Sequence, residues 1–387
     1  MIRSLRQHAL STVVTALALA LAGGLLLAVW VINAQAKRSF TDVATEFDAV
    51  LGARGSKLQL VLNAVFHLEA SPGNIRMADY EQVRRHPMVQ SAFPLAVGDN
   101  LRGFRVAGTV PEMLAHATYA SGGVWSGPEA HEAVLGSFAA RQLGLGVGDE
   151  FSPTHGLAAG GQHDHEDHYE VTGVLAPTNS PMDRVVWIPL HGVQTMDGHN
   201  VAAADQLSAV LIKLRSPAGG FMLDSMYNRQ GATLTFAFPV AAIVADLFGK
   251  ISWFEKVLAL VANLVGLVAG ATVLVAIYNS MSARRRDHAI LRALGARRRT
   301  LFGVIVLEAI TLGVMGMAGA FGVFAIIAEA IVVILRAETG AVIDPWVWHP
   351  VMAWAPAGLI ALCGLGGMVP ALKAYRTDVA EALSPTS

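Results

Sequence analysis

Histidines alternate with carboxylates in one short stretch of this 387-residue sequence, a pattern suited to binding a transition metal. Residues 154–170 read THGLAAGGQHDHEDHYE. Neutral imidazole and carboxylate are ligands of zinc and similar borderline metals. A glycine-rich lead-in over residues 158–161 predicts a flexible surface loop that wraps around an ion, joined by His199 if the fold brings it near. The candidate ligands are His155, His163, Asp164, His165, Glu166, Asp167 and His168.

The alternative is a solvated polar loop with only incidental affinity for metal. The spacing matches no closed structural zinc site, and the single cysteine, Cys363, lies in an apolar run. Any zinc or other divalent metal held here is therefore expected to exchange rather than to support the fold, and no cofactor is assigned to the chain with certainty.

Other catalytic chemistry is absent from the sequence. It contains no G-x-S-x-G elbow, no HExxH pair, no cysteine nucleophile pattern and no GxxxxGK[ST] loop for ATP. A membrane-embedded enzyme such as a protease therefore lacks a catalytic set, and the chain is expected to be non-catalytic. The net charge of −1 argues against a nucleic-acid partner.

The elements that carry these residues are dominated by apolar helices. Hydrophobic residues make up 53% of the chain and charged residues 15%, against about 25% charged in ordinary soluble domains. A membrane-spanning helix needs about 20 apolar residues. Four runs meet this length, and the third is interpreted as one long helix able to bend at its glycines. The runs are Leu10–Ile32, Phe254–Tyr278, Leu301–Leu335 and Val351–Val369.

Basic residues set the predicted orientation. Seven arginines lie in the short segment 281–300, Arg3 and Arg6 precede the first run, and Lys373 and Arg376 follow the last. Short loops rich in Lys and Arg stay in the cytoplasm. The termini and segment 281–300 are therefore expected inside and residues 35–250 outside, a prediction that the Lys37–Arg38 pair weakens without reversing. A cleaved signal peptide is the alternative for the first run, which exceeds the usual length of about 7–15 residues.

The fold class that follows is an integral membrane α-helical protein with four transmembrane helices and a large α+β extracytoplasmic domain inserted between helices 1 and 2. Short β-type runs at Tyr169–Leu175, Val185–Pro189 and Ala209–Leu214, with a helix over 129–146, predict an α+β domain of two lobes. The expected segments are 1–34 (amphipathic start and helix 1), 35–250 (outer domain), 251–280 (helix 2), 281–300 (coupling helix), 301–336 (helix 3), 337–350 (outer loop), 351–373 (helix 4) and 374–387 (cytoplasmic tail).

The segment 281–300 reads MSARRRDHAILRALGARRRT and predicts a docking element. Ile290, Leu291 and Leu294 form an apolar stripe at helical spacing, and Gly295 supplies a C-terminal stop. A short amphipathic helix held at the membrane surface is well placed to bind another protein. The alternative is a loop that only obeys the positive-inside rule.

Polar residues inside the apolar runs are the remaining candidates. Glu308 and Glu329 are costly at membrane depth unless they are paired or face water. Glu308 is expected to lie near the cytoplasmic interface and to pair with an arginine of the 281–300 segment. Asn263 is interpreted as a hydrogen bond between helices rather than as a transport site.

At this point the sequence resembles the MacB/FtsX-type (type VII) ABC transporter permeases. The segment Arg284–Gly295 is similar to the family's Arg-rich Ile-Leu-Arg-Ala-Leu-Gly helix, and Gly367–Leu383 is similar to its ending. Ala140–Asp149 (ARQLGLGVGD), followed by Gly173-Val174 and Val185–Leu190, resembles the family's periplasmic core domain.

The resemblance implies a homodimer in the bacterial inner membrane that works with two copies of a cytoplasmic ABC ATP-binding subunit, which carries ATP and Mg. Closure of that subunit would move the membrane helices and so work the outer domain on periplasmic or membrane-extracted cargo. Other implied partners are membrane lipid and a periplasmic or outer-membrane protein, and the alternative is a membrane-anchored metal-binding or sensor protein without transport. The implied contact residues are Arg285, Arg286, His288, Ile290, Leu291, Leu294 and Gly295.

Overall fold

The computed structural model describes residues 9–156, 166–196, 205–231, 233–283, 290, 294–339 and 343–376. Contacts within the chain separate two compact units. The helical unit comprises residues 1–36, 251–333 and 343–387. The α+β domain comprises residues 37–250 together with residues 334–342.

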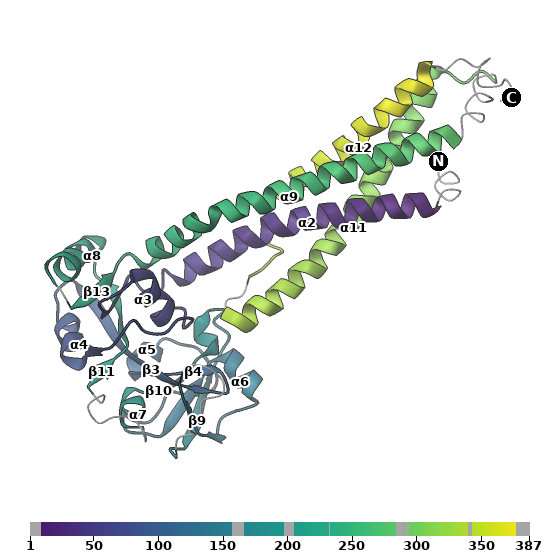
Figure 1. Ribbon diagram of the computed structural model, residues 1–387. Coiled ribbons are helices and arrows are strands. Elements are labelled where there is room, and N and C mark those ends of the chain that lie inside the picture. The colour runs from purple at the N-terminus through teal and green to yellow at the C-terminus, as the bar shows by residue number, and fades with distance from the viewer. Residues whose placement is uncertain are drawn as a thin grey trace. The chain divides into compact units, whose positions relative to one another are not determined.

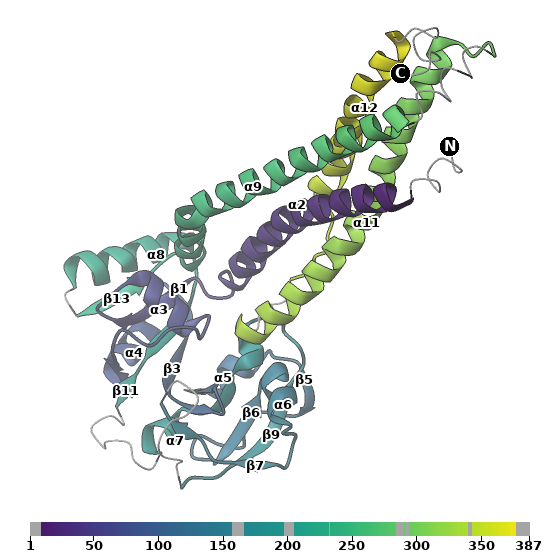
Figure 2. The ribbon, with the colours of Figure 1, turned by 45° about the vertical axis from the view of Figure 1, so that its right-hand side comes forward.

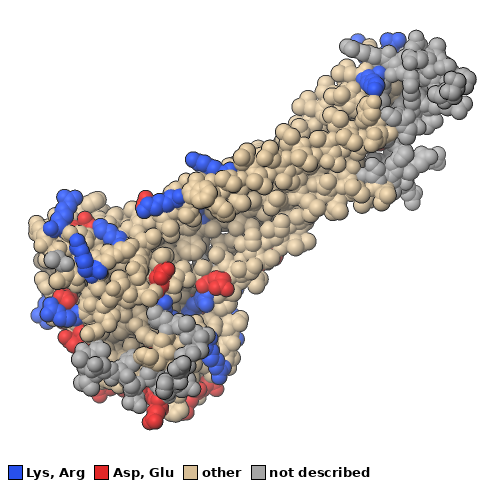
Figure 3. Space-filling view, viewed as in Figure 1, with Lys and Arg blue, Asp and Glu red and all other residues tan. Residues whose placement is uncertain are grey.

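Within the described ranges, four helices are long and apolar enough to cross a membrane (Figures 1 and 2). They are α2 (Ala9–Val43), α9 (Val240–Ala283), α11 (Arg298–Thr339) and α12 (Val351–Arg376). The third apolar run is one continuous helix, as predicted. Its 42 residues rise about 63 Å at 1.5 Å per residue, twice the thickness of a hydrocarbon core of about 30 Å. Along the length of the bundle, the face seen in Figure 3 shows little charge.

The α+β domain is built on a mixed sheet. In the described part of the chain the sheet has 11 strands, of which nine follow the order β13-β1-β12-β3-β4-β10-β6-β9-β5, while β7 pairs with β9 and β8 pairs with β3. A separate pair joins β11 to β2. The strands are β1 (Ala49–Ala53), β2 (Ile75–Arg76), β3 (Val89–Leu101), β4 (Phe104–Thr109), β5 (Tyr119–Gly122), β6 (Glu132–Leu135), β7 (Glu150–Phe151), β8 (Thr154–His155), β9 (Tyr169–Leu175), β10 (Val186–Pro189), β11 (Gln206–Leu207), β12 (Ala209–Leu214) and β13 (Leu234–Ala237).

Short helices cover this sheet, and they bury three apolar cores. One core contains Leu51, Ile212 and Phe236 from the β13-β1-β12 side, and another contains Leu135, Val171 and Ile188 from the β10-β6-β9 side. A third core lies around Trp187 and draws on both sides. The helices are α3 (Lys57–Ala64), α4 (Met77–Arg84), α5 (Pro111–Leu114), α6 (Ser137–Leu143), α7 (Leu190–Thr195), α8 (Pro217–Asp224), the 3₁₀ helix η1 (Pro181–Arg184) and the π-helical turn η3 (Ser225–Gln230).

Strands β9, β10 and β12 confirm the three β-type runs read from the sequence. The helix expected over 129–146 is wrong in its first half, because residues 132–135 form β6 and only Ser137–Leu143 is helical. Gly136 separates the two elements in an extended conformation, and a Cβ there would lie 2.4 Å from the carbonyl oxygens of Met182 and Asp183. The apolar spacing that suggested one helix is therefore shared between a buried strand and a short helix.

Candidate functional site

Glycines bring the membrane helices α2 and α11 into backbone contact. A Cβ on Gly316 of α11 would lie 2.4 Å from the Cβ of Leu19 on α2. From the other side, a Cβ on Gly23 would lie 2.8 Å from the Cβ of Ala320. Small residues allow helices to pack this closely in lipid, where dispersion contacts hold helices together. Helices α2 and α11 are therefore closely fitted, and displacement of one requires displacement of the other.

Glycines also allow α12 to pack closely against its neighbours α11 and α9. A Cβ on Gly367 of α12 would meet the Cβ of Ala309 on α11 at 2.5 Å. On the other side, Leu362 of α12 reaches over Gly270 of α9, where an added Cβ would lie 2.4 Å from Leu362 Cδ2. Close contacts therefore run from α2 to α11, from α11 to α12 and from α12 to α9.

Two cation–aromatic pairs tie α12 to both helices that flank segment 281–300. The Lys373 ammonium group donates a hydrogen bond of 2.7 Å to the Tyr278 hydroxyl of α9 and lies 4.8 Å from the ring centroid. The Arg298 guanidinium group of α11 lies 5.7 Å from the centroid of Tyr375. A cation close to an aromatic ring is attracted by the electrons of the ring face. Both ends of the segment are thereby fixed to the same helix.

Of the seven predicted coupling residues, Ile290, Leu294 and Gly295 lie in the described part of the chain. The Leu294 amide donates to the Ile290 carbonyl at 2.9 Å, which is the bond of one α-helical turn. Gly295 has φ of +99°, in the left-handed region where a C-terminal stop places glycine. The Leu294 side chain is 80% exposed and is thus available to a partner. Arg285, Arg286, His288 and Leu291 lie outside the described residues.

Asp48 joins three segments within the α+β domain. Its carboxylate accepts a 2.7 Å hydrogen bond from the Leu214 amide at the end of β12. Its own amide donates to the Ile212 carbonyl, and its carbonyl accepts from the Val240 amide at the start of α9. The residue lies between α2, which ends at Val43, and β1. One residue thus holds the entry to β1, the end of β12 and the start of α9 together.

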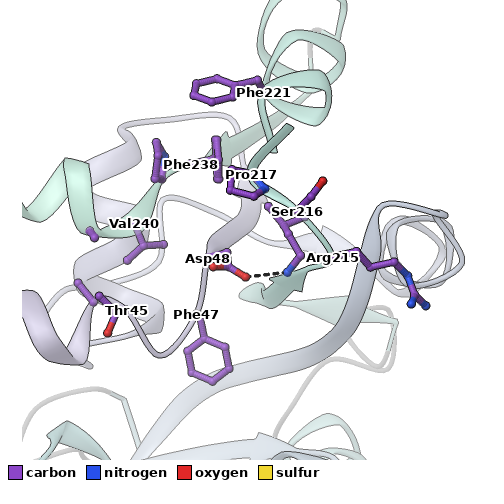
Figure 4. A pocket seen from close by; sticks show the side chains of 13 residues that line it. Thr45, Phe47, Asp48, Arg215, Ser216, Pro217, Phe221, Phe238 and Val240 are labelled. Atoms are coloured by element: carbon purple, nitrogen blue, oxygen red, sulfur yellow. Dashed lines mark hydrogen bonds between the residues drawn. The ribbon is translucent and has the colours of Figure 1, made fainter. Parts of the chain in front are cut away.

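A cavity of about 400 Å³ opens beside Asp48, and Figure 4 shows residues from the three segments around it. Apolar side chains dominate the wall. Phe221 is 66% exposed and packs edge-to-face with Phe238, the ring centroids being 5.2 Å apart. The lining comprises Ala44, Thr45, Phe47, Asp48, Leu214, Arg215, Ser216, Pro217, Phe221, Phe238, Pro239, Val240 and Ala241. The segments joined by Asp48 are therefore not fully packed against one another.

The predicted metal ligands are only partly described. His155 Nδ1 lies 3.3 Å from Oδ1 of the buried Asp99, and His168 Nδ1 lies 3.0 Å from Ser152 Oγ. Glu166 is exposed and Asp167 is half-buried. Among the residues that the structure describes, no group of three or more His, Cys, Asp or Glu side chains could hold an ion. His163, Asp164, His165 and His199 lie outside the described residues, so the metal site stays a prediction.

The intramembrane polar residues behave differently from one another. The Asn263 side chain donates to the Ala259 carbonyl of its own helix at 2.8 Å. The carboxamide has a second N–H and an oxygen that this bond does not use, so the predicted hydrogen bond between helices stays a prediction. Both glutamates lie on α11. Glu308 is half-buried and is not without an interaction partner, while Glu329 is exposed.

Asp48 and the Tyr278–Lys373 pair were missed by reasoning from the sequence. Asp48 looks like an ordinary loop carboxylate after Phe47, and its partners come from β12 and α9. Tyr278 and Lys373 are 95 residues apart, although both lie at ends of apolar runs on the same predicted side of the membrane. That shared depth is the only sequence signal that points to their pairing.

Two family models match consecutive parts of the chain. Residues 12–219 match the MacB-like periplasmic core domain, and this match spans more than half of the 387 residues. Residues 259–379 match the FtsX-like permease C-terminal model. The second match contains segment 281–300 and the pairs that anchor α12.

The chain is also similar to individual proteins. It is 26% identical over 341 residues to an uncharacterized ABC transporter permease protein of Mycobacterium tuberculosis, covering 81% of this chain and 35% of that protein. The chain thus spans about a third of the length of this curated relative. The periplasmic region of MacB from Actinobacillus actinomycetemcomitans aligns with a TM-score of 0.35 and 10% identity over 53% of this chain and 92% of that one. The extracellular domain of the noncanonic ABC-type transporter YknZ from Gram-positive bacteria aligns with a TM-score of 0.32 and 14% identity, covering 48% and 97% of the two chains.

Proposed function

Since this chain belongs to the MacB/FtsX-type family of ABC transporter permeases, we propose that it is a non-catalytic membrane subunit that couples ATP hydrolysis on a separate subunit to movement of its α+β domain. The match of the two family models in this order is the observation that carries the proposal. The expected complex is a homodimer of this chain with two ATP-binding subunits that hold ATP and Mg. Its cargo is periplasmic or extracted from the membrane, and a periplasmic or outer-membrane protein completes the path.

The orientation that this function requires places the α+β domain in the periplasm and segment 281–300 in the cytoplasm of a bacterial inner membrane. The seven arginines of the segment support this arrangement, because short basic loops remain inside. In the sequence the domain lies between the first two membrane helices, α2 and α9, which therefore connect it to the membrane.

The coupling step is assigned to segment 281–300, which docks on the ATP-binding subunit. The apolar side chains of Leu294 and Ile290 are 80% and 44% exposed, although large apolar side chains gain free energy when buried. The arginines around them supply donors for carboxylates on the partner. The complete contact set comprises Arg285, Arg286, His288, Ile290, Leu291, Leu294 and Gly295.

Movement at this segment then has a physical route to the α+β domain. The Tyr278–Lys373 and Arg298–Tyr375 pairs pass displacement to α12. The glycine contacts of α11 and α12 carry it to α2 and α9. These two helices lead into β1 and out of β13, where Asp48 holds the chain. Each step is a close contact or a hydrogen bond, so the route transmits a displacement of helices and involves no chemical reaction.

Metal could act on this function through the loop between β8 and β9. Both ends of the loop are held, one by the His155–Asp99 pair and the other by the His168–Ser152 contact. A zinc ion bound between those ends would regulate engagement of cargo on the periplasmic surface. A membrane-anchored metal sensor that needs no ATP-binding subunit is the competing function.

The test replaces Leu291 and Leu294 together with Asp. Burying an unpaired charge at an interface costs several kcal/mol, so the ATP-binding subunit should no longer co-purify with the permease. The matched control is Val147→Asp, which places a charge on an apolar residue of the α+β domain that is 50% exposed. Recovery of the ATP-binding subunit at the wild-type level with both Asp substitutions would show that the segment is not the contact.

A further inference from the structure

Arg184 lies beside two aromatic rings in the half of the sheet farthest from the strands that connect to α2 and α9. It is the last residue of η1, and one residue, Val185, separates it from β10. Its guanidinium carbon lies 5.7 Å from the ring centroid of Phe104 on β4 and 5.9 Å from that of Phe138 on α6. The two rings are 6.1 Å apart and tilted by 55°, so the cation faces both of them. Both rings therefore attract the same cation.

The same side chain reaches a membrane helix. Its Nη1 donates to the carbonyl oxygen of Ala337, in the last turn of α11. Residues 334–342 group with the α+β domain rather than with the helical unit. The last four carbonyls of a helix have no partner within the helix, and a cation there is favoured by the helix dipole. Arg184 therefore acts as a C-terminal cap supplied by a distant element.

Electrostatics at Arg184 reinforces this geometry. Burial lowers the pKa of the Arg184 guanidinium, and the neighbouring carboxylate of Glu338 raises it. Arginine stays charged in proteins in spite of such shifts. A charged, partly desolvated donor forms a stronger hydrogen bond to a carbonyl than a neutral donor does. The positive charge of Arg184 thus strengthens its hydrogen bond to α11.

The position of Arg184 in the sheet gives this link a mechanical meaning. Helices α2 and α9 connect to β1 and β13, which lie at one end of the strand order. Arg184 leads into β10, which pairs with β4 and β6 on the other side of β3. Inputs from different membrane helices therefore act on different halves of one sheet.

We propose that Arg184 is a positioning residue through which the end of α11 holds the β4-β10-β6 half of the α+β domain. This inference rests on the proposed function for its purpose, since a mechanical coupling needs to drive one half of the domain against the other. A single attachment at β1 and β13 would move the domain as a whole. A second attachment at Arg184 lets the helices change the angle between its halves.

The experiment measures whether α11 and this half of the domain move together. Spin labels are placed at Arg141→Cys on α6 and Ile334→Cys on α11, both exposed, in a Cys363→Ala background. The full-length permease in lipid nanodiscs, without the ATP-binding subunit and with labelled chain diluted by unlabelled chain, should give one narrow distance distribution. Arg184→Gln keeps a polar group but removes the cation and shortens the side chain, and the distribution should broaden or split.

The control is Arg85→Gln, which removes an 80% exposed arginine whose partner is Glu81 on the same helix, and it should leave the distribution narrow. A broad distribution in the wild type, or an unchanged one in Arg184→Gln, would overturn the proposal. A broad distribution in the wild type would overturn the proposal even if Arg184→Gln fails to fold. Arg184→Gln should still co-purify with the ATP-binding subunit, because it leaves segment 281–300 intact. A broad wild-type distribution with normal co-purification would therefore reject this inference and leave the proposed function standing.

Discussion

Replacing Gly316 with alanine should push α2 and α11 apart. The new Cβ would lie 2.4 Å from the Cβ of Leu19, an atom fixed to the backbone of α2. A rotamer change cannot relieve this overlap, because a Cβ does not move when its side chain rotates. Ordinary carbon contacts begin at about 3.4 Å, so the two helices must separate by about 1 Å.

Two opposing terms set the size of the effect. Overpacking a well-packed interior costs about 1–3 kcal/mol. Alanine is favoured over glycine within a helix by about 0.5–1 kcal/mol, which offsets part of that cost. Gly322, on the same helix, isolates the second term, because a Cβ there meets nothing within 4 Å. Gly322→Ala should therefore be neutral or stabilising, and the two variants should differ by about 1–3 kcal/mol.

The assay is reversible unfolding of the purified permease in mixed detergent micelles, followed by circular dichroism, for the wild type and both alanine variants. Gly316→Ala should unfold at a lower denaturant fraction than the wild type, and Gly322→Ala at the same fraction or a higher one. Equal shifts in the two variants would refute the reasoning, because they would show that α2 and α11 are not in backbone contact at Leu19.

Three further predictions concern pH, metal and orientation. Burial lowers the pKa of His67 to about 3, with Arg105 adding to the effect, so the unfolded chain binds a proton below about pH 6.5 while the folded chain does not. Stability should then be complete above pH 6.5 and fall by about 1.4 kcal/mol per pH unit as pH drops toward 4. His67→Asn, which tolerates the φ of +55° at this position, should flatten that slope in thermal melts of the full-length protein. Isothermal titration with zinc should show micromolar or tighter binding that weakens below about pH 6.5; equal heats from a variant lacking three loop histidines would mean that the loop is merely polar. The three histidines replaced in this zinc experiment are His163, His165 and His168. In spheroplasts of a Cys363→Ala strain, an impermeant thiol reagent should label Val147→Cys and spare Leu294→Cys, and the opposite pattern would reverse the predicted orientation.

Local patterns in the sequence predicted most of the helices and strands that they were applied to, but not the contacts between them. Tyr169–Leu175 and Ala209–Leu214 are rich in β-branched and aliphatic residues, and both form the strands expected of them. The run before Gly136 misled because its three buried residues, Ala133, Val134 and Leu135, fit a strand and a helix equally well. Only the carbonyls of Met182 and Asp183, about 46 residues away in the chain, fix the break at that glycine.

The candidate site also contains residues that the sequence identifies and residues that only the folded structure reveals. The Arg-rich segment and its Gly295 stop were evident from residue types alone, since they depend on neighbours in the sequence. Asp48 and Arg184 act on backbone groups of β12, α9 and α11, which no local pattern identifies. Asn263 donates to a carbonyl of its own helix, a local bond that the sequence did not predict, and its predicted bond to another helix stays a prediction.

The pairing of β1 with β13 decides how the α+β domain can bear a load. These strands are antiparallel, with Val50 opposite Ala237, so α2 and α9 attach at the same end of the pair. A force that separates the two helices would break the hydrogen bonds of this pair one after another, starting at the end where the helices attach. A force that moves both helices together leaves the bonds between β1 and β13 unloaded and acts on the pairing of β1 with β12, to which Asp48 adds its hydrogen bond to Leu214. The bond between Asp48 and Val240 lies where the opening of the β1–β13 pair would start. The pair is therefore weak against spreading, and under the proposed function we expect α2 and α9 to be displaced together.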